Sequence, residues 1–305
     1  MKRISKLCLA FVPLAFTACD NSDRVGPTPE RASEEAPQFA AAAPAGIVFA
    51  SFGLQPSQMS SVHTGGVRGI TPSAILSYLA QTKAKGGRAL LNLGREARNA
   101  DGTFSLTAWK ARIDQYRGVN LGPYIADGTL IGHFLVDEPH FQSRWGGKII
   151  PQSTVEEMAR HSKQLWPTMA TIVNAPLHWL ADSPITYTFL DAGWAMYWSS
   201  TSSNPKWAAN QVASAKRKGL GMFSGLNVLD GGNGTSGFRG NYPHRWAMSA
   251  SELRSYGSAL LSQSYVCGFA MWKYTSAYYD RPDIKSAMAE LSTKAKNHAK
   301  TSCRQ

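Results

Sequence analysis

The sequence has little of several things that would define a simple class of protein. It holds only 4 cysteines in 305 residues, too few for a small fold held together by disulfides. No apolar run reaches the roughly 20 residues of a membrane span, which excludes a multi-pass membrane protein. Internal repeats and long low-complexity tails are also missing, and 43% of the residues are hydrophobic. The chain is therefore expected to bury a sizeable core.

Several motifs of catalysis and ligand binding are absent as well. There is no Gly-x-Ser-x-Gly of a nucleophile elbow, no Cys-x-x-Cys and no His-Glu-x-x-His. The first apolar run continues as 50–54 without the Gly-rich loop that holds a dinucleotide phosphate. We therefore predict no metal and no cofactor.

The chain is basic, with 32 Lys and Arg against 20 Asp and Glu and a net charge of +12. Such a charge can attract acidic polymers. The lysines are scattered over predicted helix faces, however, and neither a dense basic stripe nor a nucleic-acid motif is present. We expect solvated helix faces and no nucleic-acid partner.

Residues 1–18 have the features of a secretory signal peptide. Lys2, Arg3 and Lys6 form a basic head, an apolar stretch too short to span a membrane follows, and small residues precede Cys19. This ending resembles a bacterial lipoprotein cleavage site, which implies lipidation of Cys19 and a membrane-anchored place in the cell envelope, periplasmic or surface-exposed. The alternative is ordinary cleavage near Ala18, with Cys19 left as a thiol.

Residues 19–45 are predicted to be a flexible linker, because they carry four prolines and an alanine run without any apolar period. Residues 46–305 are predicted to form one domain. There, strand-length apolar runs alternate with amphipathic stretches of helix length, at 47–52, 89–93, 130–136, 169–173, 193–198, 221–228 and 268–274.

This alternation predicts a parallel sheet covered by helices on both faces. Its length is close to the about 250 residues of a (β/α)8 TIM barrel, which is the α/β fold we predict. The eighth strand is expected between residues 54 and 70, and the alternative is a doubly wound open sheet. Capping signals at Thr71-Pro72, at Ser153 with Glu156 and at Ser249 with Glu252 mark predicted helix starts.

In such a barrel the functional residues lie at the carboxyl ends of the strands. Asp137, Glu138 and Pro139 end the apolar run 130–136. A half-buried Glu there would have a raised pKa and could donate a proton near neutral pH. The alternative is a structural Asp-Glu pair bonded to an Arg such as Arg144.

This segment resembles barrel-type glycoside hydrolases, many of which end their fourth strand in Asn-Glu-Pro or Asp-Glu-Pro. The resemblance implies that Glu138 is the general acid/base and that Asp137 orients it or binds a sugar hydroxyl. Such enzymes need a second carboxylate, usually a Glu near the seventh strand. This chain offers Asp230 instead, as nucleophile or base or as an Asx-turn residue. Glu96 and Asp191 are weaker candidates.

Aromatic and amide side chains at the strand ends fit a sugar site, because flat aromatic rings suit the C–H faces of sugars. The predicted substrate-binding residues are Trp272, Tyr274, Trp198, Tyr197, Asn174, Asn227 and Asn92. For each Trp the alternative is core packing.

Cys267 begins the last predicted strand and Cys303 follows the last predicted helix. A helix runs back antiparallel to its strand, so both cysteines are expected at the bottom of the barrel, where an oxidising compartment would allow a disulfide.

The sequence thus predicts an exported, monomeric glycoside hydrolase-like enzyme acting on a polysaccharide. A non-catalytic carbohydrate-binding barrel and an envelope interaction scaffold remain as alternatives.

Overall fold

The computed structural model describes residues 45–201, 204–299 and 303. The predicted signal peptide, the lipidation site Cys19 and the linker up to residue 44 lie outside the described residues. Within the described part of the chain, no helix has the length and apolar character needed to cross a bilayer.

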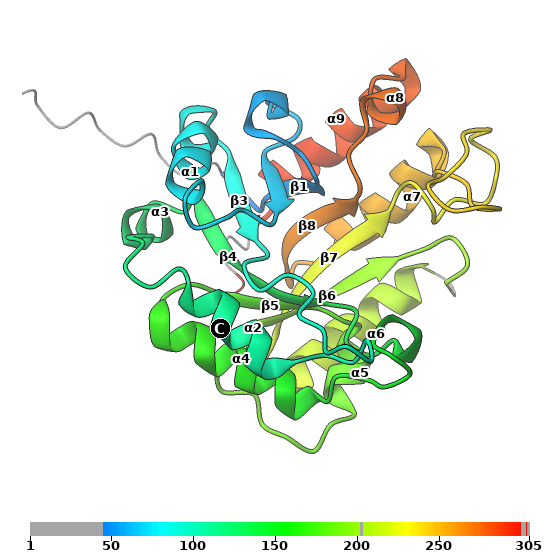
Figure 1. Cartoon of the computed structure of the whole chain (residues 1–305). Coiled ribbons are helices and arrows are strands. Elements are labelled where there is room, and N and C mark those ends of the chain that lie inside the picture. Colours follow the sequence, from blue (N-terminus) through cyan, green and yellow to red (C-terminus); the bar gives the residue numbers. More distant parts are fainter. Residues whose placement is uncertain (1–44, 202–203, 300–302, 304–305) are drawn as a thin grey trace, which may run out of the picture. The chain divides into compact units, whose positions relative to one another are not determined.

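Eight parallel strands form a closed barrel in sequence order (Figure 1). β1 pairs with β2 on one side and with β8 on the other, where Phe49 lies opposite Phe269. The predicted (β/α)8 barrel is therefore correct, and the open-sheet alternative is excluded. The strands are β1 (Phe49–Phe52), β2 (Gly65–Arg68), β3 (Arg88–Leu91), β4 (Leu130–Asp137), β5 (Thr171–Asn174), β6 (Ala192–Tyr197), β7 (Gly221–Asn227) and β8 (Val266–Trp272).

The eighth strand lies in the predicted interval, as β2. Its sequence is Gly-Gly-Val-Arg, which has neither a long apolar run nor a clear alternation. A Cβ on Gly65 would lie 2.4 Å from Val48, and one on Gly66 would lie 2.7 Å from the carbonyl oxygen of Leu54. Close packing against β1 therefore requires the two glycines that hide this strand in the sequence.

Helices follow the strands and surround the barrel (Figure 1). Two of the helices are followed by a glycine of positive φ, Gly86 at 61° after α1 and Gly219 at 65° after α6, which ends each helix. The helices are α1 (Ile75–Ala84), α2 (Leu106–Asp114), α3 (Gly122–Ala126), α4 (Gln152–Leu165), α5 (Leu177–Ala181), α6 (Asn204–Arg217), α7 (Ala250–Leu261), α8 (Ser276–Tyr279) and α9 (Pro282–Lys296), with short 3-10 turns η1 (Pro56–Gln58) and η2 (Gln142–Arg144).

Of the three predicted caps, only that of α7 is confirmed, where Ser249 and Glu252 form a capping box. Helix α1 begins at Ile75, after a turn, so Thr71 does not cap it. Helix α4 begins at Gln152 without a side-chain cap. The Glu156 carboxylate instead accepts three backbone N–H groups of residues 188–190, at 2.7–3.0 Å. Glu156 therefore fixes the loop 188–190 and does not cap helix α4.

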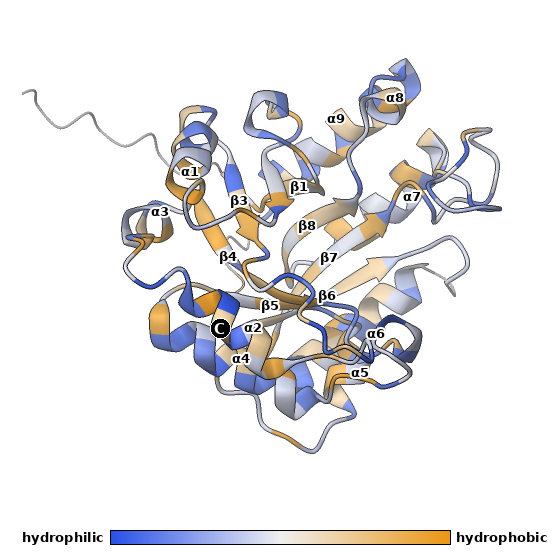
Figure 2. Ribbon diagram, in the orientation of Figure 1, coloured by the Kyte–Doolittle hydropathy of each residue, from blue (hydrophilic) through white to orange (hydrophobic). Residues whose placement is uncertain are grey.

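The core has two layers, one inside the barrel and one between the strands and the helices. Figure 2 shows mostly hydrophobic colouring on the strands and both colours on the helices. His133 of β4 belongs to the outer layer and is fully buried, stacked on Trp109 and hydrogen-bonded through Nδ1 to Ser162 at 2.8 Å. Burial lowers the pKa of His133 to about 3, so it is a neutral core histidine. The interior layer includes the aromatic side chains of Phe134, Trp194 and Phe223.

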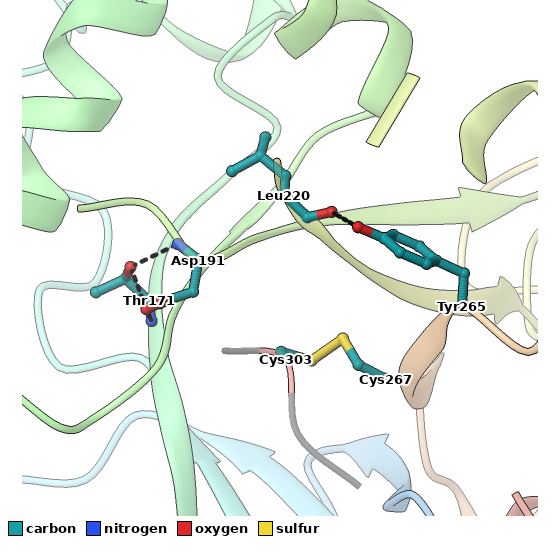
Figure 3. The surroundings of a disulfide bond; sticks show 6 residues. All are labelled: Thr171, Asp191, Leu220, Tyr265, Cys267 and Cys303. Carbon is teal, nitrogen blue, oxygen red and sulfur yellow. Dashed lines mark hydrogen bonds between the residues drawn. A yellow bond between two sulfur atoms is a disulfide. The ribbon is translucent and has the colours of Figure 1, made fainter. Parts of the chain in front are cut away.

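Cys267 and Cys303 form the predicted disulfide, with Cα atoms 4.9 Å apart (Figure 3). The same view contains Asp191, which bonds Thr171 at the amino-terminal end of β5. Both cysteines belong to the interior layer. The disulfide therefore attaches the end of the chain to the amino-terminal end of the barrel.

Replacing both cysteines with alanine should lower the free energy of unfolding by about 2–4 kcal/mol, because the bond closes a long loop in the unfolded chain. Denaturant unfolding of the double variant, of the oxidised wild type and of the reduced wild type measures this. The reduced wild type should match the variant. An unchanged midpoint, or two free thiols in a non-reduced peptide map, would contradict the bond.

Candidate functional site

The candidate site begins where β4 ends, at a local irregularity in the strand. The register between β4 and β5 shifts between Phe134 and Asp137, and Leu135 and Val136 both pack in the outer layer. Such a bulge changes the direction of the side chains that follow. Asp137 and Glu138, at the rim of the barrel, therefore do not follow the alternation of inward and outward side chains along β4.

Glu138 has a backbone conformation that is rare for its residue type, with φ at 48°. A non-glycine residue there costs about 1–3 kcal/mol and persists only when its surroundings hold it. The N–H of Glu138 donates to the carbonyl of Asn174 at 3.0 Å, and the Trp145 indole N–H donates to the carbonyl of Glu138 at 3.1 Å. Residues held this way concentrate at functional sites.

Arg144, in η2, binds three carboxylates at once. Its guanidinium lies 2.8 Å from Asp137 Oδ2 and 3.1 Å from Glu138 Oε2, and it also pairs with Glu96. Arg98 adds a second cation, 2.8 Å from Glu96 Oε2. The Arg144 pairing that the sequence left as an alternative is therefore present. The structure also brings Glu96, a weaker candidate, to the same cluster.

The surroundings move the pKa values of these acids in different directions. Burial, together with the negative charge of Asp137, raises the pKa of Glu138, although Arg144 opposes this. Burial also raises the pKa of Asp137. Partial burial acts on Glu96 in the same sense, but the hydrogen bonds and charges of Arg98 and Arg144 outweigh it, so the pKa of Glu96 is lowered. The cluster thus holds two carboxyl groups of raised pKa, Asp137 and Glu138, beside Glu96, which stays ionised.

Two of the predicted amides belong to this side of the rim. Asn174, at the end of β5, donates from Nδ2 to Asp137 Oδ1 at 2.5 Å and is nearly buried. Asn92 follows β3 and accepts the N–H of Arg95 at 2.7 Å, so it shapes the turn that leads to Glu96. Asn174 orients an acid, whereas Asn92 supports a loop.

Asp230 lies at the end of β7 in a different environment. It is 1% exposed, and its carboxylate accepts the N–H of Tyr242 at 3.0 Å and the side-chain amide of Asn241 at 3.2 Å. Asn227 Oδ1 accepts the N–H of Asp230 at 3.0 Å. Both side chains therefore organise the loop between β7 and α7. The carboxylate of Asp230 does so through partners 11 and 12 residues further along the chain, and so not through an Asx turn.

The predicted aromatic residues divide between the rim and the outer layer. Trp272, joined to Lys273 by a cis peptide bond, packs its ring edge-on against Phe52 at 4.9 Å. Trp198 and Tyr274 are half-buried at the ends of β6 and β8. Tyr197, by contrast, is 2% exposed and packs on Trp207 and Tyr256 among the helices. We therefore remove Tyr197 from the candidate site.

The other weak candidate, Asp191, is not at the rim. It bonds Thr171 and pairs with Lys163 at 2.5 Å, at the opposite end of the barrel from Glu138. A cavity of about 420 Å³ lies at that end too, lined by Arg88, Ile131 and the disulfide. It is separate from the acid cluster.

Sequence reasoning missed Trp145, which contributes to the site, and Arg68, which lies at the same rim. Trp145 holds the backbone of Glu138 and carries the Arg98 guanidinium 4.4 Å above its ring. Arg68 ends β2 and donates to the carbonyl of Gly53 at 2.6 Å. Recognition of Gly65–Arg68 as a strand would have placed Arg68 at the rim. Within the described part of the chain, no group of three or more His, Cys, Asp or Glu side chains could hold a metal ion.

No protein-family model matches the chain, and no curated protein matches its sequence. Solved structures do share its fold. A beta-glucanase from Saccharophagus degradans, in complex with cellotetraose, has a TM-score of 0.56 at 9% identity, covering 83% of this chain and 88% of the glucanase. The structure of a cellulase–inhibitor complex has a TM-score of 0.55 at 10% identity, covering 81% and 92% of the two chains. The chain therefore has the (β/α)8 fold of these glycoside hydrolases.

Glu138→Gln should change how stability depends on pH. Because the folded state raises the pKa of Glu138 above its ordinary 4.5, the folded wild type binds more protons than the unfolded chain in that window and loses stability as pH rises through it. The variant lacks this loss, so its free energy of unfolding should improve relative to the wild type as pH rises above 4.5, as measured by denaturant unfolding.

Glu157→Gln is the matched control with the opposite sign. Hydrogen bonds from Arg160 and Lys110 lower the pKa of Glu157 to about 2, so this variant should lose stability relative to the wild type as pH rises from 2 to 5. Parallel behaviour of the two variants would contradict the assignment of a raised pKa to Glu138.

Proposed function

We propose that this protein is a glycoside hydrolase acting on a polysaccharide, with Glu138 as its general acid/base. One observation carries the proposal: Glu138 and Glu96 share Arg144 at the rim, and the pKa of the first is raised while that of the second is lowered. Two carboxylates poised differently are the chemistry that glycoside cleavage requires. The fold shared with a glucanase and a cellulase supports the same reading.

In this proposal Glu138 donates a proton to the glycosidic oxygen as the bond to the leaving sugar breaks. Glu96 is the second carboxylate, as nucleophile or as the base that activates a water. Asp137 orients Glu138 through Arg144. Trp272 and Trp198 offer faces for sugar rings, because each is partly exposed at the rim. Tyr274 packs with Tyr279 against the outer layer instead.

Arg144 sets a condition on catalysis. A guanidinium bonded to Glu138 favours the ionised carboxylate and opposes proton donation. Productive binding therefore requires Arg144 to exchange its bond to Glu138 for one to the substrate, while it keeps Glu96 and Asp137.

Glu138→Gln should reduce turnover by roughly a hundredfold or more, because the amide keeps the shape and cannot donate the proton. The measurement is release of reducing sugar ends from a panel of envelope and plant-type polysaccharides. Unchanged turnover in this variant would overturn the role of Glu138.

Two further variants identify the second carboxylate. Glu96→Gln should reduce turnover by a similar factor and lower the midpoint of unfolding only modestly, since Glu96 is half-exposed and solvent screens its pairs with Arg144 and Arg98. Asp230→Asn weakens bonds within a buried loop and should lower the unfolding midpoint. If Asp230→Asn abolishes turnover in a fully folded protein while Glu96→Gln does not, Asp230 is the second carboxylate.

A non-catalytic carbohydrate-binding barrel is the second candidate function. It is favoured by the carboxylate of Asp230, which its own loop occupies at the place where glycosidases usually carry the second acid. Saccharide binding without hydrolysis, lost in Trp272→Ala, would support this function over the enzyme.

We also propose that the protein is an exported, monomeric lipoprotein of the cell envelope, anchored through Cys19. The basic head and the small residues before Cys19 support this proposal, as does the Cys267–Cys303 bond, since disulfides persist in oxidising compartments.

Cys19→Ser should release the protein from membranes, because acyl chains on Cys19 would be the only attachment. Fractionation after a salt wash measures this, with Cys303→Ser as a control that keeps the anchor. A Cys19→Ser variant that stays with the membrane would contradict lipidation.

A further inference from the structure

Three cations lie at the carboxyl-end rim on the side formed by β6, β7 and β8. Arg239 and Arg245 belong to the loop between β7 and α7, and Lys273 directly follows β8. We call these three residues the cationic rim. Figure 1 shows the β7–α7 loop, in yellow, extending beyond the ends of the strands.

Each of these cations lies over a tryptophan ring. The distance to the ring centroid is 3.8 Å for Arg239 over Trp246, 5.6 Å for Arg245 over Trp198 and 5.6 Å for Lys273 over Trp272. The rim therefore alternates positive charge with flat aromatic surface, on three successive strand-end loops.

Hydrogen bonds fix the conformation of the loop that carries the two arginines. Asp230 accepts the N–H of Tyr242 and the side-chain amide of Asn241, and the N–H of Gly240 donates to the carbonyl of Arg245 at 3.0 Å. The buried carboxylate of Asp230 thus fixes the stretch between the arginines, which makes Asp230 a positioning residue for the rim.

Within the described residues, no carboxylate forms an ion pair with any cation of the rim. Cations on the helices differ, as Arg254 pairs with Glu290 at 2.8 Å and Lys110 pairs with Glu157. Arg239 and Arg245 are also exposed. The rim thus presents positive charge without a carboxylate partner at the carboxyl-end face of the barrel.

A stacked guanidinium keeps the donors at its edge free, and their fork matches the two oxygens of a carboxylate. The acids Glu96, Asp137 and Glu138 lie at β3 and β4, and β4 is four places from β8 in the closed barrel. The acids at β3 and β4 are already paired with Arg144 and Arg98, whereas the cations of the cationic rim have no carboxylate partner among the described residues. An anionic group would therefore be attracted to the side of β7 and β8.

We propose that the cationic rim binds the carboxylate groups of an acidic, uronate-containing polysaccharide, whose sugar rings lie against the tryptophans while the bond to be cleaved lies at Glu138. This inference rests on the proposed function and names its class of substrate. It gives the rim arginines and Lys273 the role of specificity residues.

The experiment compares each acidic polymer with its own carboxyl-reduced form, so that only the charge differs. Polygalacturonate, alginate and hyaluronate serve as probes, and binding is measured by affinity electrophoresis and calorimetry with the full mature chain. At least one acidic polymer should bind about tenfold or more tighter than its reduced form. The triple variant Arg239→Gln, Arg245→Gln, Lys273→Gln should lose that preference.

The control variant is Lys85→Gln, Lys206→Gln, Lys296→Gln, which removes the same charge from exposed positions on or next to helices and should keep the preference. Equal loss in the two triple variants would show general charge attraction and overturn the rim. Tighter, rim-dependent binding of a single-stranded DNA oligonucleotide would overturn the choice of ligand.

The remaining outcomes separate the two proposals. Equal binding of acidic and reduced polymers, or hydrolysis of neutral glucans alone, overturns the acidic substrate and leaves the glycoside hydrolase standing. Failure to bind any polysaccharide, acidic or neutral, overturns the proposed function together with the inference.

Discussion

The parallel hydrogen-bond ladder that runs from β1 to β8 and closes on β1 is the constraint on which the rest of this structure depends. Closure leaves no free strand edge, and parallel order puts every carboxyl end at one rim. Residues as far apart in sequence as Arg68, Glu138 and Trp272 are thereby collected on one face. The disulfide and Asp191 are confined to the other face, where they stabilise the barrel without limiting the site.

The acid cluster lowers the stability of the fold, and contacts from the surrounding loops offset this effect. Glu138 has a rare backbone conformation, and its carboxylate and that of Asp137 are largely withdrawn from water. Arg144 and Asn174 offset the cost through charge and hydrogen bonds, and Trp145 fixes the backbone. Unfavourable backbone conformations and partly buried carboxylates that are held in place by their surroundings are typical of a functional site.

Acids that are buried or partly buried have two distinct uses in the described part of this chain, and their partners distinguish the two. Glu156, Glu252 and Asp230 accept backbone N–H groups of loops, so each stabilises one loop conformation. Asp137 and Glu138 instead pair with a side-chain cation, the guanidinium of Arg144. The first kind of contact builds the scaffold, whereas the second leaves a charge that a ligand can exchange. By this criterion Asp230 supports the rim and Glu96 belongs with Glu138.

The sequence by itself determined the fold class, the positions of seven strands, the disulfide and the place of Asp137 and Glu138. It could do so because apolar runs, helix stops and strand ends are local signals, and the order of a parallel barrel follows from them. The sequence did not give the bounds of the strand Gly65–Arg68, since its two glycines allow close packing but add nothing to a hydrophobic pattern. Tyr197 was misplaced because a residue at a strand end faces either the mouth or the helices, and only the register decides which. The junction of Glu96 with Glu138, the loop role of Asp230 and the pairing of Arg245 with Trp198 came from tertiary structure alone. Each joins residues on different loops, and no local pattern records which loops meet.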